Sequence, residues 1–402
     1  MSGRGELVTF YPPLERIRSA LRGKYSAIST GPASIEVRDK LDKLVCRIAV
    51  LAAAGDSFWL TLEPLRGYAR DTEQMRTRLL AVGFITEDAW KDPQVPMSAG
   101  ERADVVVARV LLRLLEIQDA NLPGALAGSH VEFLHDFRVA IRRTRSVLRE
   151  MRGVFAPDDL MRVRAEFKWL QDQTSATRDL DVYLEDFDQL RALAPDKLHD
   201  DLAPLEPLLR ERHQRARATM ERALVSQRLR TLRSEWEEIL QVLVLESERD
   251  RPDAARPIGE LASKRIRKVH HKMVKMGRAI TPDSPPDQYH ELRKKGKELR
   301  YLLELFGTQL FDQDVVKPMI KTLKGLQDVL GLHQDREVQI EMLKELASDL
   351  VSRPGGAEAL MATGTLIDRL EDDAHAARGR FASAFAEFAS DAQCKLVAQV
   401  FS

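Results

Sequence analysis

Two stretches of the sequence decide how this chain folds: His135–Ser146 (HDFRVAIRRTRS) and His290–Tyr301 (HELRKKGKELRY). In both, basic residues follow the histidine by 3, 7 and 10 positions. These are Arg138, Arg142 and Arg145 in the first stretch, and Arg293, Lys297 and Arg300 in the second. The same spacing at a separation of about 155 residues indicates an internal repeat.

The match between the two copies resumes some thirty residues later. Lys168–Asp172 (KWLQD) corresponds to Lys324–Asp328 (KGLQD). Eight positions after the glutamine of each copy stands an aspartate, Asp179 or Asp335. Because the two aspartates match, we interpret them as structural carboxylates that orient basic residues, rather than as magnesium ligands.

Helical periodicity dominates from residue 98 onward, and proline and glycine fall between the periodic runs. We therefore predict a mainly α fold with two pseudo-symmetric four-helix bundles, at about 98–250 and 257–402. Since each copy needs a partner to cover its apolar face, the two bundles should dock about a pseudo-two-fold axis.

Residues 1–97 differ from the rest and predict a small α+β segment. Two β-like runs, Leu44–Leu51 and Phe58–Leu62, flank a turn at Ala54–Ser57. A short helix is expected near Asp71–Val82. Asp92–Pro96 (DPQVP) then forms a linker to a helical domain at 98–402.

Composition narrows the function classes. Of the 402 residues, 44% are apolar, enough for a large core, and only 6% are aromatic, which argues against an all-β sandwich. The 62 basic and 62 acidic residues cancel, which excludes a chain that is basic throughout. The charges are nevertheless segregated, because 260–300 carries twelve basic and five acidic residues, whereas 337–373 carries three basic and nine acidic residues.

The basic residues of the two histidine stretches share one helix face. At 100° per residue, His135, Arg138, Arg142, Arg145 and Arg149 fall within an arc of about 80°. His290, Arg293, Lys297 and Arg300 occupy the same arc in the second copy. Like charges at these spacings repel each other, so a stripe this uniform predicts an external polyanion. A merely solvated face is the alternative, and the repetition in both copies disfavours it.

Further basic residues join the predicted anion site. The next helix of each copy contributes Arg164 and Lys168, and Lys321 and Lys324, respectively. Less central candidates are Arg215, Lys264, Arg267, Lys268 and Lys317. The neighbouring His270 and His271 are expected to face solvent or to join the same site.

The sequence contains no phosphate-binding GxxxxGK[ST] loop, no HExxH and no GxSxG. We therefore expect no catalytic residues, no cofactor and no enzyme activity. No second metal-ligating side chain stands at ligand spacing on the stripes, so no metal site is expected either.

Two cysteines, Cys46 and Cys394, form no CxxC pair, which excludes a zinc ribbon and fits a reducing compartment. No run of 18 apolar residues occurs. A cytoplasmic protein without a membrane partner is the expectation, and the sequence indicates no oligomeric state.

The two histidine stretches, together with Thr177–Val182 (TRDLDV) and Leu326–Gly331 (LQDVLG), resemble the CHAD family, the conserved histidine α-helical domain. The resemblance covers about residues 100–390. It implies two four-helix bundles around a basic pore that binds long-chain inorganic polyphosphate, and an association with polyphosphate granules. One departure is Glu298, where the first copy has Arg143; we expect its side chain to turn away from the stripe.

The N-terminal stretch Trp59–Tyr68 (WLTLEPLRGY) looks like the end of a CYTH domain, the triphosphate tunnel fold that often precedes CHAD domains. The segment is too short for an eight-stranded tunnel and lacks an ExExK strand. We expect a reduced remnant without triphosphatase activity.

Three readings compete with polyphosphate binding: nucleic-acid or nucleotide binding, a phosphate-processing enzyme with an unrecognised site, and a helical scaffold. Single-strand binders interleave stacking rings with their charges. The basic stripes contain few aromatic residues, with Tyr301 as the main exception. Polyphosphate has no bases to stack, so it ranks first, and nucleic acid is not expected as a partner.

Overall fold

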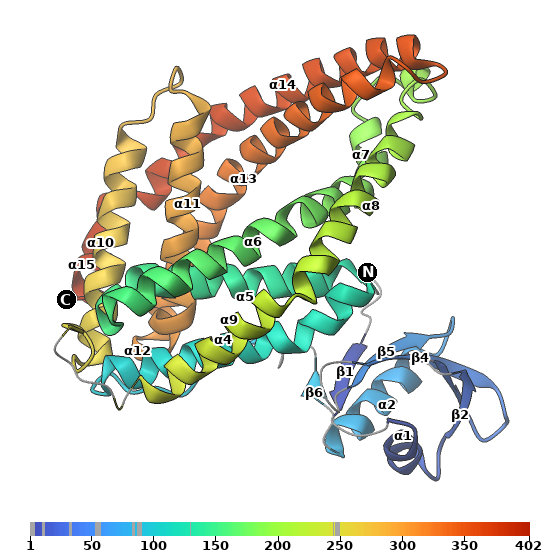
Figure 1. Ribbon diagram of the computed structural model, residues 1–402, viewed down its shortest axis with the longest axis horizontal. Coiled ribbons are helices and arrows are strands. Elements are labelled where there is room, and N and C mark those ends of the chain that lie inside the picture. The colour runs from blue at the N-terminus through green and yellow to red at the C-terminus, as the bar shows by residue number, and fades with distance from the viewer. Residues whose placement is uncertain are drawn as a thin grey trace. The chain divides into compact units, whose positions relative to one another are not determined.

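The computed structural model describes residues 5–9, 13–31, 34–52, 58–82, 85–86, 91–128, 130–243, 245 and 250–402 (Figure 1). Two compact units divide the chain. The first contains Met1–Pro93 and Leu112–Arg142, and the second contains Gln94–Leu111 and Arg143–Ser402. The division therefore passes through two helices, α4 (Ala103–Ala127) and α5 (Val131–Glu150).

An antiparallel sheet with the strand order β2-β3-β4-β5-β1-β6 forms the N-terminal part of the first unit. Ile17 and Leu21 of α1 and Met75 and Leu79 of α2 are fully buried in the same core as the sheet residue Ile48. The element bounds are β1 (Gly5–Thr9), α1 (Pro13–Leu21), β2 (Ser26–Gly31), β3 (Ser34–Arg38), β4 (Leu44–Ala52), β5 (Phe58–Pro64), α2 (Ala69–Ala81) and β6 (Ile85–Thr86).

The two predicted β-like runs are confirmed as β4 and β5, which pair with each other, and the predicted short helix is confirmed as α2. The expected turn at Ala54–Ser57 lies outside the described residues. The remaining strands and α1 were not predicted, because β2 (SAISTG) and β1 (GELVT) are short and carry few large apolar residues.

The rest of the first unit, Leu112–Arg142, contains the end of α4 and the start of α5, which pack against each other. Nδ1 of His130 accepts a hydrogen bond from the backbone N–H of Glu132 at 3.2 Å and so caps the start of α5. Gly124 of α4 lies against the ring of Phe133, in a space that a Cβ atom would overlap. A glycine here permits the close approach of the two helices.

The second unit is helical. The longest pair, α13 and α14, turns at Gly355, whose φ of 71° is left-handed and favours glycine. Besides α5, its elements are η1 (Arg152–Val154), α6 (Pro157–Glu185), α7 (Phe187–Arg191), η2 (Asp196–Leu198), α8 (Leu205–Leu224), α9 (Gln227–Val242), α10 (Ile258–Arg278), α11 (Pro286–Leu302), the π-helical turn η3 (Leu303–Gly307), α12 (Thr308–Leu310), α13 (Gln313–Leu350), α14 (Gly356–Phe388) and α15 (Asp391–Val400).

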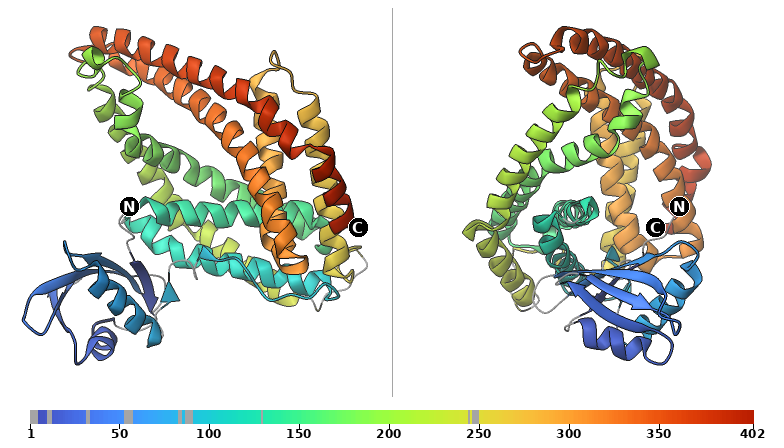
Figure 2. Two further views of the ribbon diagram at one scale, coloured as in Figure 1. Left: turned by 180° about the vertical axis from the view of Figure 1, so that it is seen from behind. Right: turned by 90° about the vertical axis from the view of Figure 1, so that its right-hand side faces the viewer.

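The far end of the α13–α14 pair packs against the first copy. Figure 2 shows the two helices side by side, with their far ends next to α7 and α8. One buried apolar cluster joins Leu180 of α6 and Leu209 of α8 to Leu346 and Leu366 of this pair. The two copies therefore share a core, as the repeat predicted.

A backbone bridge shows that a two-fold operation relates the copies. The N–H of Ala103 donates to the carbonyl of Arg256 at 2.8 Å, and the N–H of Ile258 donates to the carbonyl of Glu101 at 2.8 Å. Under the repeat, Ala103 corresponds to Ile258, and Glu101 corresponds to Arg256. Each bond is thus the image of the other, as at an isologous interface.

Two ion pairs follow the same symmetry. Arg143 pairs with Glu304 at 3.2 Å, and Arg149 pairs with Glu298. Under the repeat, position 143 corresponds to 298 and position 149 to 304, so these pairs also exchange. The first copy supplies both arginines and the second copy supplies both glutamates. The pseudo-two-fold docking predicted from the sequence is therefore confirmed within the second unit.

Two glycines with different surroundings test the packing of the second copy. In Gly277→Ala, the new methyl group would overlap the ring of Phe385, and we expect the free energy of unfolding to fall by about 1–3 kcal/mol. Gly325 is exposed on α13 and has no neighbour that a Cβ would meet. Gly325→Ala should instead raise the free energy of unfolding by about 0.5–1 kcal/mol. Urea denaturation of both variants measures these opposite signs; equal effects would contradict the packing of α10 on α14.

Candidate anion-binding site

The first part of the α5 stripe belongs to the first unit. Arg138 is buried, with 7% of its surface exposed, and His135 and Arg142 are half-buried. Burial on this scale restricts the side-chain rotamers of a cation, which prepares it for a ligand held in one place.

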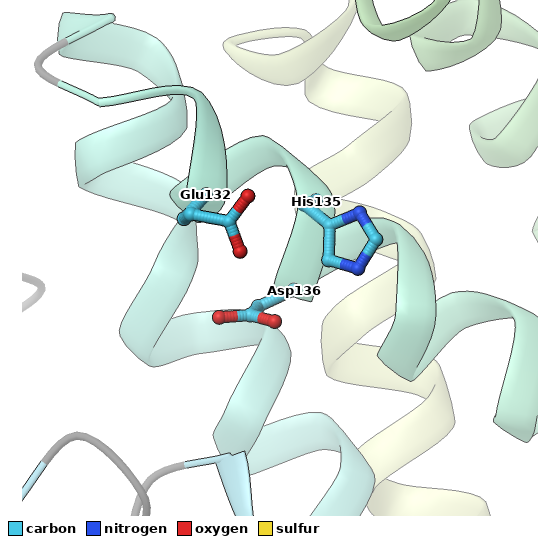
Figure 3. Close-up of side chains that lie close together, drawn as sticks. All are labelled: Glu132, His135 and Asp136. Carbon is cyan, nitrogen blue, oxygen red and sulfur yellow. The ribbon is translucent and has the colours of Figure 1, made fainter. Parts of the chain in front are cut away.

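A group of possible metal ligands surrounds the stripe histidine. Ligand atoms of Glu132, His135 and Asp136 all lie within 4.8 Å of one another (Figure 3). The two carboxylates were not predicted as metal ligands, although their i and i+4 spacing on one helix brings them together. Nζ of Lys91 lies 3.0 Å from Oδ2 of Asp136 and already supplies a positive charge there. A metal ion at these residues would have to compete with that ammonium group.

The second part of the α5 stripe holds several cations close together. Burial lowers the pKa of Arg145, and the nearby charges of Arg149 and Arg164 lower it further. Arg145 also donates a hydrogen bond to Oε1 of Gln171 on α6, while Lys168 is exposed and pairs with Asp172. Arg149 and Arg164 therefore lie close enough to Arg145 for their like charges to repel it, and a bound anion would relieve that repulsion.

The α11 stripe lies close to the carboxylate of Asp335 on α13, whose side chain is 64% exposed. Nη2 of Arg293 lies 3.5 Å from Oδ1 of Asp335. Desolvation raises the pKa of Asp335, while Arg293, Lys297 and Arg336 oppose that rise through their positive charges. The contact with Arg293 fits the hypothesis that Asp335 orients basic residues, which stays a prediction. Sequence reasoning missed Arg336, because it stands one position after Asp335 on α13 and outside both histidine stretches.

The ends of the α11 stripe are also held by partners. His290 forms a hydrogen bond through Nδ1 with the side-chain oxygen of Gln334. Nε of Arg300 lies 3.6 Å from Oε1 of Glu304. The guanidinium carbons of Arg300 and Arg143 lie 5.6 and 5.9 Å from the centre of the Tyr301 ring, which is only 4% exposed.

Glu298 turns off the stripe of its own helix, as expected, but it contacts the α5 stripe. It is 4% exposed and pairs with Arg149 of the other stripe and with Lys295. The repeat alone could not reveal this contact, because it depends on how the two copies dock. Arg149 therefore has a carboxylate partner before any ligand arrives.

The remaining candidates lie on exposed helix faces. Lys317, Lys321 and Lys324 are exposed on α13, and Lys264, Arg267 and Lys268 are exposed on α10. Arg164 is exposed on α6. Arg215 of α8 is exposed and lies 3.7 Å from Glu211.

The acidic segment 337–373 has a structural partner on α8. Arg212 pairs with Glu345 at 2.9 Å and with Asp349 at 3.0 Å. Arg353 in turn pairs with Glu211 at 2.8 Å. This part of the charge segregation therefore serves the contact between the two copies.

The expectation for His270 was wrong. Its side chain is 6% exposed and its ring lies 5.1 Å from that of Phe388. Burial lowers the pKa of His270 to about 4, so the ring is neutral at pH 7. Its spacing from Ile266 and Met273 places it on the apolar face of α10, whereas His271 is exposed.

Comparisons with known proteins agree with this architecture. A family model described as the CHAD domain matches residues 108–344. The crystal structure of the CHAD domain from the plant Ricinus communis superposes with a TM-score of 0.57 and 23% identity, covering 70% of this chain and 94% of that one. PptA from Streptomyces chartreusis gives a TM-score of 0.48 and 20% identity, covering 71% and 99%, respectively. No curated protein matches the sequence.

The likeness to the Ricinus communis structure supports the helical fold and its arrangement alone. None of the described helices combines the length and the apolar character needed to cross a lipid bilayer.

Proposed function

Because the chain belongs to the CHAD domain family, we propose that it binds long-chain inorganic polyphosphate and catalyses no reaction on it. In this proposal the α5 and α11 stripes line one basic pore that holds an extended phosphate chain. Binding would also bring the protein to polyphosphate granules in the cytoplasm. The metal-ligand group at Glu132 is not needed for this function.

The observation that carries the proposal is the crowding of like charges. Arg145 is half-buried next to Arg149 and Arg164, and Arg293 and Lys297 converge on Asp335. Crowded cations cost free energy unless an anion compensates them. Guanidinium groups bind phosphate oxygens through two parallel hydrogen bonds, so a chain of phosphates fits such a row.

The surroundings of the aromatic residues favour polyphosphate over single-stranded nucleic acid. All four aromatic residues of α5 and α11 are buried: Phe133, Phe137, Tyr289 and Tyr301, at 5%, 2%, 3% and 4% exposure. Proteins that bind single-stranded nucleic acid present accessible aromatic rings on which the bases stack. Tyr301, which the sequence analysis left as an exception, is therefore not available to stack on a base.

We expect binding without turnover, with a steep dependence on salt. Fluorescence anisotropy with labelled long polyphosphate should show affinity falling by orders of magnitude between about 50 and 300 mM salt, because each neutralised phosphate releases a counterion. In the same buffer with magnesium, chain length and phosphate release should not change with time. Protein-dependent shortening at a steady rate would refute the non-catalytic proposal, and an affinity insensitive to salt would refute an electrostatic site.

A further inference from the structure

The outer face of α10 carries a basic surface that the two histidine stripes do not account for. No acidic residue occurs between positions 261 and 282. Seven basic residues of this helix are exposed, and we call them the α10 face: Lys264, Arg267, Lys268, His271, Lys272, Lys275 and Arg278. From Lys264 to Arg278 the face extends about 21 Å along the helix axis.

The α10 face is uncompensated. Within the part of the chain that the structure describes, no ion pair joins any of the seven residues to a carboxylate. The basic residues of α8 behave differently: Arg212 pairs with Glu345 and Asp349, and Arg217 pairs with Glu221 at 2.7 Å. Seven like-charged or titratable groups at helical spacing repel one another, which destabilises the helix slightly without an anion.

The α10 face points away from the α11 stripe. Met273 of α10 packs on α11, where its methyl group lies 3.5 Å from the position of a Cβ on Gly296. At 100° per residue, the seven residues of the α10 face fall within about 70–80° of the direction opposite Met273. Figures 1 and 2 show α10 and α11 running side by side. The α10 face is therefore a separate surface of the second copy.

The first copy has no equivalent of the α10 face. Of the corresponding positions on α4, only two are basic, Arg109 and Arg113, and both have partners. Arg109 pairs with Glu101 at 2.9 Å, and Arg113 pairs with Glu116 at 2.8 Å. The remaining equivalents are Leu112, Glu116, Ile117, Ala120 and Pro123. Both copies of the repeat therefore contain a basic stripe, whereas the α10 face occurs in the second copy alone.

We propose that the α10 face is a second polyphosphate-binding surface, which engages chains that are long enough to reach it from the stripes. This inference rests on the function proposed above and adds a basis for chain-length selectivity. A chain bound in the stripes presents its free part to α10 at a high effective concentration. A short chain occupies the stripes alone and gains nothing from α10.

Two other polyanions fit the α10 face less well. A helix that binds a membrane surface buries large apolar side chains among the lipids, and 258–278 contains no exposed large apolar residue. A single-stranded nucleic acid requires rings on which its bases stack, and α10 contains no Phe, Tyr or Trp. A chain of phosphates needs cations alone.

The test removes three charges from the α10 face in the full-length protein, at positions outside the predicted stripe site: Lys272→Gln, Lys275→Gln and Arg278→Gln together. The matched control removes three exposed charges elsewhere: Lys197→Gln, Arg222→Gln and Arg230→Gln. We expect the α10 variant to lose about tenfold or more in affinity for long polyphosphate, with a shallower salt dependence. Its affinity for short polyphosphate and its melting temperature should equal those of the control.

Each other outcome overturns the inference in a recognisable way. Equal losses for short and long chains would make α10 part of the stripe site, and no loss for either would make it a solvated face. A loss confined to single-stranded DNA or to anionic lipid vesicles would assign the α10 face to that partner instead. If the unaltered protein binds no polyphosphate of any length, the proposed function itself fails.

Discussion

Charge reversal on either stripe is expected to weaken the binding of long polyphosphate by on the order of 100-fold while leaving the number of chains bound per protein unchanged. The two variants are Arg142→Glu with Arg145→Glu on α5, and Lys297→Glu with Arg300→Glu on α11. Each replaces two phosphate-binding cations by two anions in a crowded part of the site. If one pore holds one chain, damage to either stripe weakens the same binding event.

Calorimetric titration separates this result from its alternative. Two independent sites would give each variant half the stoichiometry and an affinity equal to that of the unaltered protein, which would reject the single pore. Lys197→Glu with Arg230→Glu is a control for the change in net charge. Because Arg145 and Arg300 are half-buried, Arg145→Gln and Arg300→Gln provide variants in which repulsion falls and no new charge is introduced.

Glu298→Lys is expected to lower the free energy of unfolding by about 3–5 kcal/mol, because it places an ammonium group at a buried position next to Arg149 and Lys295 and removes their shared counterion. Glu298 is 4% exposed and pairs with Arg149 across the pseudo-two-fold axis and with Lys295 on its own helix. Burial and the charge of Glu298 both raise the pKa of the adjacent Glu150. In a neutral variant such as Glu298→Gln, the carboxyl group of Glu150 can compensate for part of the lost negative charge. Charge reversal in Glu298→Lys is therefore the stricter test.

Urea denaturation measures this loss of unfolding free energy, and two further variants serve as controls. Glu291→Lys, on the same helix, breaks an exposed pair with Lys294 and should change the unfolding free energy by less than about 1 kcal/mol. Exchanging the charges in Arg149→Glu with Glu298→Arg should recover part of the stability. Equal, small effects for Glu298→Lys and Glu291→Lys would show that the cross-axis pair contributes nothing.

The fold followed from the sequence wherever a pattern was repeated. The 3, 7 and 10 spacing after His135 and His290 predicted two helical copies, and the backbone bridge between Ala103 and Arg256 confirms that a two-fold relates them. The residues that meet across the pseudo-two-fold axis stand at positions where the two copies differ in charge. Position 143 is Arg and its equivalent 298 is Glu, and position 149 is Arg and its equivalent 304 is Glu.

Such differences carry a signal that matching alone does not. Residues that meet across the axis occupy different positions of the repeat, so opposite charges at two pairs of equivalent positions can satisfy each other. The opposite charges at these positions, Glu298 and Glu304 against Arg149 and Arg143, predict the contact between the copies, which we had not inferred from the sequence. The prediction that His270 faces solvent or joins the anion site was wrong for a simpler reason. Its spacing from Ile266 and Met273 places it on the buried face of α10, although basic residues surround it in the sequence.

The candidate site was predicted in part. Sequence spacing identified the cations of α5 and α11, and the structure brings Arg145 close to Arg149 and Arg164, and Lys297 close to Asp335. Spacing could not identify Arg336, whose charge acts on Asp335 while its side chain pairs with Asp373 at 3.1 Å. It also did not distinguish the stripes from the α10 face, since both are basic helix faces and only packing separates them.

One calorimetric titration tests the central claim most directly: the full-length protein against long polyphosphate and, separately, against single-stranded DNA with the same number of phosphates. The proposed function predicts tight binding of polyphosphate at a fixed stoichiometry, weakened by salt, and much weaker binding of the DNA. DNA binding as tight as that of polyphosphate, or no heat with polyphosphate at low salt, would contradict it.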